Sequence, residues 1–297
     1  MSRRLREILT LPSTAARWWR RTTTAPAVEQ WLLVVGLPTL LVGTWLAGLE
    51  TRFAFRLSAD SVWASPSTVL TAFTANYVHF GSRHLLDNLL NYWVTLFAIY
   101  PLVAIAGWGR QFRLSIVAYL VAAPFAIAVV TLAVFDPQTE QFVVGFSGIV
   151  AALLGFLPVV LAAAASEQTK GAVDPAWAVV PFLFSVALVF AIPSGPYFSG
   201  HPPLAVGLGL LGVAVAGRLW AEFPSARLGA YRRGLTPDVR LAFLIGSTVF
   251  VFGITGAFVF VHVGTNVWGH LAGYMVGFAV PYLAFVIRPL LIYSVPE

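Results

Sequence analysis

Long apolar runs, separated by short polar stretches, set the strongest constraint on how this chain can fold. Runs of about 17 to 25 apolar residues match the length that an α-helix needs to cross ~30 Å of hydrocarbon. Hydrophobic residues make up 59% of the 297 residues and charged residues only 10%, which is far from the balance of a soluble domain. Because lipid-exposed irregular backbone is not tolerated in hydrocarbon, these runs predict a multi-pass bundle of α-helices.

The runs predict eight spans, at roughly 31–48, 84–106, 112–135, 142–165, 176–193, 203–220, 241–262 and 267–287. The turn-rich stretch IPSGPYFSGHPP between the fifth and sixth spans also fits two re-entrant pieces, and removing that pair leaves six spans. We therefore expect an all-α polytopic membrane protein with a six-helix core and an extra helical pair. Residues 1–30 would form a cytoplasmic N-terminal segment, and residues 31–290 would form one transmembrane domain.

The basic residues predict the orientation of these spans. With a cytoplasmic N-terminus, fifteen of the eighteen Lys and Arg residues fall in inner segments, and only Arg52, Arg56 and Arg83 lie outside. We expect a plasma-membrane protein whose N- and C-termini both lie in the cytoplasm. The long outer segment 49–83 is rich in aromatic residues and is expected to rest in the membrane interface. No nucleic-acid motif accompanies the basic charge, so no nucleic-acid partner is expected, and the absence of cysteine excludes thiol chemistry.

A stripe of polar side chains marks the outer end of the second span, in HFGSRHLLDNLLN. At 100° per residue its members fall within a sector of about 100° on one helix; they are His84, Asp87, Asn88 and Asn91. His79 precedes this helix and need not face the same way. A hydrogen-bond seam between helices, worth ~0.6 kcal/mol per bond, would explain one such residue. Four on one face favour a functional site.

A serine flanked by glycines lies in the fourth span, in VVGFSGIVAALLG. Read as continuous helix, the span places Ser147 about six residues from its outer end, at a depth of ~9 Å. A lone serine in a membrane helix usually bonds to its own backbone. Gly145 and Gly148, however, leave the surface around this hydroxyl bare, which allows another helix backbone to approach closely.

The last span carries a histidine in NVWGHLAGYMVG. His270 lies about four residues into the helix, above a groove formed by Gly273 and Gly277. Ser147, His84 and His270 therefore share one depth on the outer side. A Ser and a His brought together there could form a nucleophile and base pair without a third acid.

Three groups could donate hydrogen bonds to an oxyanion beside that pair: the Asn88 amide, the His84 ring and the backbone N–H of Ser147. Other hydrolytic chemistries do not fit the spacing. His79 and His84 are five residues apart without the Glu of a helical zinc site, so no metal site is predicted. GFSGI lacks the G-x-S-x-G pattern of soluble hydrolases, and no strand is predicted before it.

These residues resemble the rhomboid intramembrane serine proteases, over roughly residues 60–165 and 262–285. The resemblance rests on three motifs in the family's order: H-x-x-x-x-H-x-x-x-N at His79, His84 and Asn88, G-x-S-G at Gly145, Ser147 and Gly148, and H-x-x-G-x-x-x-G at His270, Gly273 and Gly277.

The resemblance implies a cofactor-free dyad of Ser147 as nucleophile and His270 as general base and then acid. It also implies an oxyanion site formed by His84, Asn88 and the Ser147 amide. The substrates implied are single-span membrane proteins cleaved near the outer end of their transmembrane segments.

Three departures from the family pattern are visible. Three spans are predicted between the Ser and His helices where six-span members have a single one. Trp63 is followed by Ala64 rather than by Arg, and Ala151 stands where many relatives carry a Tyr stacked on the catalytic His. Another group must therefore orient His270.

Two alternatives to a protease remain. One is a non-catalytic relative that binds transmembrane segments. The other is a transporter with a polar pathway, which would require broken helices or inverted repeats.

Overall fold

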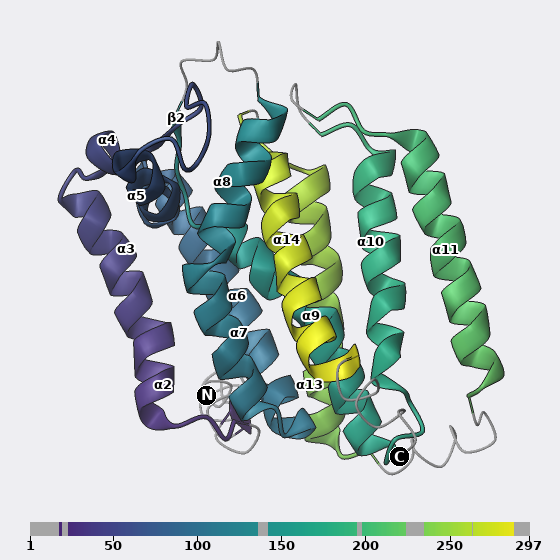
Figure 1. The fold of residues 1–297 in the computed structure, drawn as a ribbon. Helices are drawn as coiled ribbons and strands as arrows, with labels where there is room; N and C mark the ends of the chain where they lie inside the picture. Colours follow the sequence, from purple (N-terminus) through teal and green to yellow (C-terminus); the bar gives the residue numbers. More distant parts are fainter. Residues whose placement is uncertain are drawn as a thin grey trace, which may run out of the picture.

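The computed structural model describes residues 18–19, 23–135, 142–194, 198–223, 235–262 and 264–287, which form a bundle of long helices (Figure 1). Within these ranges six helices are long and apolar enough to cross a membrane, or seven if one bent pair counts as a span. The polytopic all-α fold predicted from the sequence is thereby confirmed. The predicted span 176–193 is the shorter apolar helix Pro175–Ala191. The predicted N-terminal segment 1–30 lies mostly outside the described residues.

The elements follow the predicted order of spans. The first span runs through α2 (Ala27–Trp31), the π-helical η1 (Leu32–Gly36) and α3 (Leu37–Leu46). The outer segment contains α4 (Glu50–Phe53), β1 (Phe55–Arg56), α5 (Pro66–Thr74) and η2 (Ala75–Tyr77). The next helices are α6 (Ser82–Ala106) and the pair α7 (Gly109–Val121) and α8 (Ala123–Val134), bent by 44°. The remaining elements are β2 (Phe142–Val143), α9 (Ser147–Gln168), η3 (Pro175–Ala178), α10 (Val179–Ala191), α11 (Pro202–Ala221), α13 (Pro237–Ile254), η5 (Thr255–Val259), α14 (Val267–Pro281) and η6 (Tyr282–Ile287).

Helix α9 forms the centre of the bundle, and α14 packs directly on its backbone. The span of α9 is 89% buried, against 11% for the first span. A Cβ atom added at Gly273 would lie 1.9 Å from the Gly148 carbonyl oxygen, and one at Gly277 would lie 2.0 Å from the Ala152 carbonyl oxygen. Only glycine fits at such a crossing, so the two helices meet along the groove predicted from the small residues.

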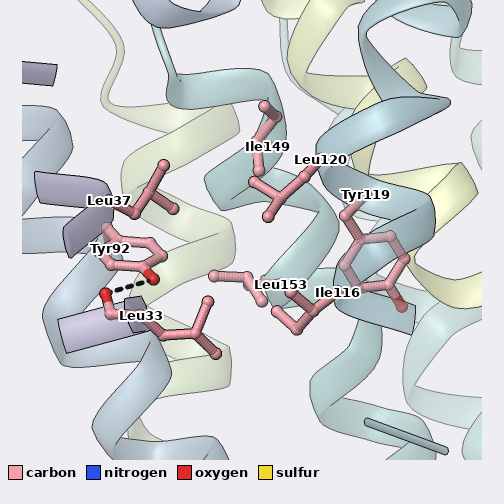
Figure 2. A pocket seen from close by; sticks show the side chains of 8 residues that line it. All are labelled: Leu33, Leu37, Tyr92, Ile116, Tyr119, Leu120, Ile149 and Leu153. Carbon is pink, nitrogen blue, oxygen red and sulfur yellow. Dashed lines mark hydrogen bonds between the residues drawn. The ribbon is translucent and has the colours of Figure 1, made fainter. Parts of the chain in front are cut away.

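Side chains of α6 bond to the first span one turn before Pro38. Because proline has no N–H, it cannot donate to the carbonyls of the preceding turn. Two aromatic side chains of α6 donate to these carbonyls instead: Tyr92 Oη to Leu33 at 2.8 Å, and Trp93 Nε1 to Val34 at 2.9 Å. The Tyr92 bond is visible in a small pocket between the first span, α6, α7 and α9 (Figure 2). Its lining is apolar and aromatic: Leu33, Leu37, Tyr92, Ile116, Tyr119, Leu120, Ile149 and Leu153.

The outer segment is held by aromatic contacts and by a two-stranded sheet. The ring of Trp63 stacks on Phe125 of α8 with 5.8 Å between centroids, and Phe73 of α5 stacks on the same ring at 5.9 Å. These contacts anchor the segment although no Arg follows Trp63. Strand β1 pairs antiparallel with β2, and Phe55 lies opposite Val143.

Helices α10 and α11 lie side by side at one edge of the bundle, at the right of Figure 1. They form an antiparallel pair rather than two re-entrant pieces, because α11 is itself long enough to span. Helix α10 packs on α14 through Phe182, which stacks on Phe278 at 3.7 Å and on Tyr274 at 5.4 Å. The extra pair therefore contacts the helix that carries His270.

Candidate active site

A cavity of about 990 Å³ lies where the N-terminal ends of α6, α9 and α14 meet the C-terminal half of α8. Its lining includes Ser147, His270, His84 and Asn88, which the sequence motifs singled out. Gly145 and Gly148 line it too, whereas His79, Gly273 and Gly277 lie outside its lining. The other polar lining residues are Asn76, Arg83, Asp87, Thr131, His262, Thr265 and Asn266.

Ser147 is the first residue of α9, not the sixth residue of a longer helix as predicted. Residues 142–146 form β2 and a turn, because Gly145 has φ +122, outside the helical region. The Gly145 N–H donates to the Ala75 carbonyl at 2.9 Å. Since the first N–H groups of a helix have no acceptor within it, the N–H groups of Ser147 and Gly148 are not used by the helix. In a helix starting at residue 142, the Ser147 N–H would be bonded within the helix.

The imidazole of His84 lies against the backbone just before Ser147. A Cβ at Gly145 would lie 2.5 Å from His84 Cε1. His79 supports both elements, because its Nε2 accepts the Phe146 N–H at 3.3 Å and its ring meets that of His84 edge to face, with 5.1 Å between centroids. Burial, with a smaller contribution from His84, lowers the pKa of His79 to about 3. His79 is therefore a neutral part of the wall behind His84.

His270 is the fourth residue of α14, as predicted, and a backbone carbonyl orients its ring. Its Nδ1 lies 3.0 Å from the carbonyl oxygen of Ala257. A carbonyl oxygen only accepts hydrogen bonds, so Nδ1 carries the proton and Nε2 is left as an acceptor. The ring of Phe258 meets His270 edge-on, with 6.3 Å between centroids. These two contacts take the place of the aromatic support that is missing at Ala151.

The motif analysis did not identify two polar residues that fix the start of α14. Asn266 caps this helix: its Oδ1 accepts the Gly269 N–H at 2.9 Å, and its Nδ2 donates to Thr131 Oγ1 of α8 at 2.8 Å. Both residues line the cavity. An Asn directly before a helix is a recognisable cap signal, but nothing in the sequence points to Thr131 as its partner.

The polar stripe of α6 divides between the cavity and the helix surface. Asn88 is buried, and its Nδ2 donates to the His84 carbonyl at 2.8 Å, which leaves one amide hydrogen for another acceptor. Asp87 lines the cavity, whereas Asn91 lies outside its lining and donates to the Asp87 carbonyl oxygen at 2.9 Å.

Within the described ranges, no hydrogen bond joins Ser147 to His270, although both line the cavity. Nor do the His, Asp and Glu side chains of these ranges form any group of three or more that could hold a metal ion. The arrangement therefore offers a hydroxyl, an imidazole with a free acceptor nitrogen and several N–H donors.

Comparison with protein families matches residues 66–202 to the Rhomboid domain. The matched range contains His79, His84, Asn88 and Ser147, and it ends before the helices α13 and α14. No curated protein and no solved structure matches the chain. This multi-pass integral membrane protein therefore carries a rhomboid domain, as its motifs indicate.

Proposed function

We propose that this protein is an intramembrane serine endopeptidase that hydrolyses peptide bonds in or near the transmembrane segments of single-span membrane proteins. One observation carries the proposal: a serine at the start of α9 and a histidine with an acceptor Nε2 line the same cavity. The pair has the chemistry of a nucleophile and its general base. The proposed reaction uses groups of the protein itself and water.

In the proposed mechanism, Ser147 Oγ attacks the carbonyl carbon of the scissile bond while Nε2 of His270 takes its proton. The imidazolium then gives that proton to the leaving amine, and water hydrolyses the acyl-enzyme with His270 again as base. The Ala257 carbonyl accepts from Nδ1–H throughout, so it holds the ring orientation that a carboxylate holds in a triad.

Three donors are proposed to stabilise the oxyanion of the tetrahedral intermediate. The Ser147 N–H lies at the N-terminus of α9, where the helix dipole favours negative charge. Asn88 keeps one amide hydrogen free, and the His84 ring lines the same cavity. Loss of one such donor lowers kcat by ~10² to 10³ in soluble serine hydrolases, and we expect a similar loss for Asn88→Ala.

The cavity at one end of the bundle suits a substrate segment that has left its helix. A peptide bond inside a transmembrane helix has its carbonyl and N–H bonded within the helix, so the segment must unwind before Ser147 can reach it. From the distribution of basic residues we propose that both termini lie in the cytoplasm and that the cavity faces outward at the plasma membrane. Cleavage would then fall near the outer end of the substrate segment.

The second candidate is a non-catalytic rhomboid-like protein that binds transmembrane segments in the same cavity. The observation in its favour is that no hydrogen bond joins Ser147 to His270 among the described residues. Incubation of purified protein with a model transmembrane substrate distinguishes the two. Cleavage by the wild type and none by Ser147→Ala or His270→Ala supports the protease; binding without cleavage by all three supports the alternative.

A further inference from the structure

The loop between α10 and α11 contacts the backbone that orients His270. Ser194 of this loop is buried, and its Oγ donates to the carbonyl oxygen of Phe258. The neighbouring carbonyl, that of Ala257, accepts from His270 Nδ1. Both carbonyls lie at the end of η5, where a helix leaves its last C=O groups without an N–H partner. Two consecutive carbonyls at this end are therefore bonded by two side chains from different parts of the chain.

The same loop also packs against the helix that carries His270. The ring of Phe198, which is 1% exposed, lies 4.8 Å from the ring of Trp268, two residues before His270. Backbone bonds hold the loop itself: the Ser194 N–H donates to the Phe198 carbonyl at 2.8 Å, and the His201 N–H donates to the Phe190 carbonyl at 2.7 Å. Ser194 is therefore bonded directly to Phe198, and His201 is bonded to the end of α10.

Helix α10 makes a third contact one turn further along α14. Ser185 Oγ lies 2.6 Å from Tyr274 Oη in a buried hydrogen bond. Ser194 bonds to the backbone carbonyl of Phe258. The side-chain ring of Phe258 lies edge-on to two rings of α14, with centroid distances of 5.7 Å to Tyr274 and 6.3 Å to His270. The extra helical pair thus reaches the surroundings of His270 through the end of η5, through Trp268 and through Tyr274.

We infer that α10 and its outer loop, residues 192–194 and 198–201, position the histidine of the proposed dyad, with Ser194 as the positioning residue. By holding the Phe258 carbonyl, Ser194 fixes the adjoining planar peptide units. The Ala257 carbonyl then faces Nδ1 and selects the tautomer in which Nε2 is the acceptor. The expected effect on kcat rests on the proposed function. The expected effect on the His270 tautomer does not, because the tautomer is a property of the protein without substrate.

The test compares Ser194→Ala with Ser194→Thr, which keeps the hydroxyl, and with Ser199→Ala, an exposed serine of the same loop. Nitrogen-15 NMR of the histidine side chains reports the tautomer, and the signal that disappears in His270→Gln identifies His270. We expect the Nδ1-protonated form in the wild type, Ser194→Thr and Ser199→Ala, and a mixture of tautomers in Ser194→Ala. With a transmembrane peptide substrate, Ser194→Ala should lower kcat by about tenfold or more and leave KM unchanged. For comparison, a displacement of a catalytic group by ~1 Å can lower the rate by ~10².

The outcomes separate this inference from the proposed function. A changed tautomer in Ser194→Ala, in a protein whose wild type cleaves nothing, supports the positioning role and contradicts the protease. An unchanged tautomer and kcat in a folded Ser194→Ala variant overturns the positioning role. It is equally overturned if Ser194→Ala loses thermal stability and kcat while the His270 tautomer stays as in the wild type, since Ser194 is then only structural.

Discussion

The Nδ1 atom of His270 lies 3.0 Å from the carbonyl oxygen of Ala257, thirteen residues earlier in the chain. This carbonyl is free because the helix of α13 and η5 ends just beyond it, at Val259. A backbone group thus orients the ring in the way that a carboxylate does in the Ser-His-Asp triad of serine hydrolases. A neutral carbonyl raises the basicity of the ring less than a carboxylate does. Its main contribution to the proposed chemistry is therefore to fix the orientation and tautomer of the ring, and this contribution depends on the position of the carbonyl.

Gly145→Ala is expected to disable the candidate site more severely than a comparable glycine substitution elsewhere. Gly145 has φ +122, and an added Cβ would lie 2.5 Å from His84 Cε1, so both the backbone and the imidazole must move. Gly171 is the control, because it has φ +80, has nothing within 4 Å of an added Cβ and lies outside the cavity lining. We expect Gly145→Ala to lower kcat by about 10² and Gly171→Ala to lower it far less. Equal kcat losses in the two variants would show that backbone strain alone is responsible.

Gly277→Ala is expected to destabilise the bundle, whereas Gly207→Ala is not. The added methyl at Gly277 would lie 2.0 Å from the Ala152 carbonyl oxygen and would force α14 away from α9, while Gly207 has nothing within 4 Å. Overpacking of this kind costs about 1–3 kcal/mol or more. Thermal unfolding of the purified proteins in nonionic detergent measures the difference. An unchanged melting temperature for Gly277→Ala would contradict the close packing of the two helices.

Tyr119 and Pro281 are expected to be energetically coupled. Pro281 has no N–H to donate to the Gly277 carbonyl one turn earlier, and Tyr119 Oη donates to that carbonyl instead, at 2.6 Å. Tyr119→Phe should therefore cost about 1–3 kcal/mol of unfolding free energy, because it leaves a buried carbonyl without a donor. In a Pro281→Ala background the new N–H satisfies this carbonyl, so the same substitution should cost less. Additive effects in the double-mutant cycle would rule out this explanation.

His79 is expected to make the protein less stable as the pH falls. Its folded pKa of about 3 lies below the 6.5 of the unfolded chain. Between these values the unfolded chain binds a proton that the folded protein does not, so the free energy of unfolding decreases on acidification, by up to ~1.4 kcal/mol per pH unit. In His79→Gln the amide oxygen can still accept the Phe146 N–H. This variant should show a shallower pH dependence than the wild type, and identical slopes would argue against a buried neutral His79.

The helices were largely predictable because the thickness of the hydrocarbon layer dictates the length of an apolar run. The start of α9 was not, since Val143, Val144 and Phe146 continue the apolar run while Gly145 leaves the helical region. That difference matters for the site. A helix that begins at Ser147 leaves the N–H of this residue available to a ligand, whereas a helix that begins at residue 142 does not.

Four polar residues of the cavity, Ser147, His270, His84 and Asn88, were also predictable, because motif spacing indicates which side chains share a helix face and an end of the bundle. Their orienting partners were not. The carbonyl of Ala257 is a backbone group that every residue possesses, so no residue type marks it. The bond from Asn266 to Thr131 joins residues 135 positions apart, and only the packing of α14 on α8 brings them together.

Covalent labelling tests the proposed dyad most directly. Purified protein in detergent is treated with a fluorophosphonate, which reacts with activated serines, and the modified residue is located by mass spectrometry of its peptides. The account predicts one adduct, on Ser147, that is lost in Ser147→Ala and strongly reduced in His270→Ala, while unreacted protein remains folded. An adduct on another serine, or equal labelling of Ser147 with and without His270, would contradict it.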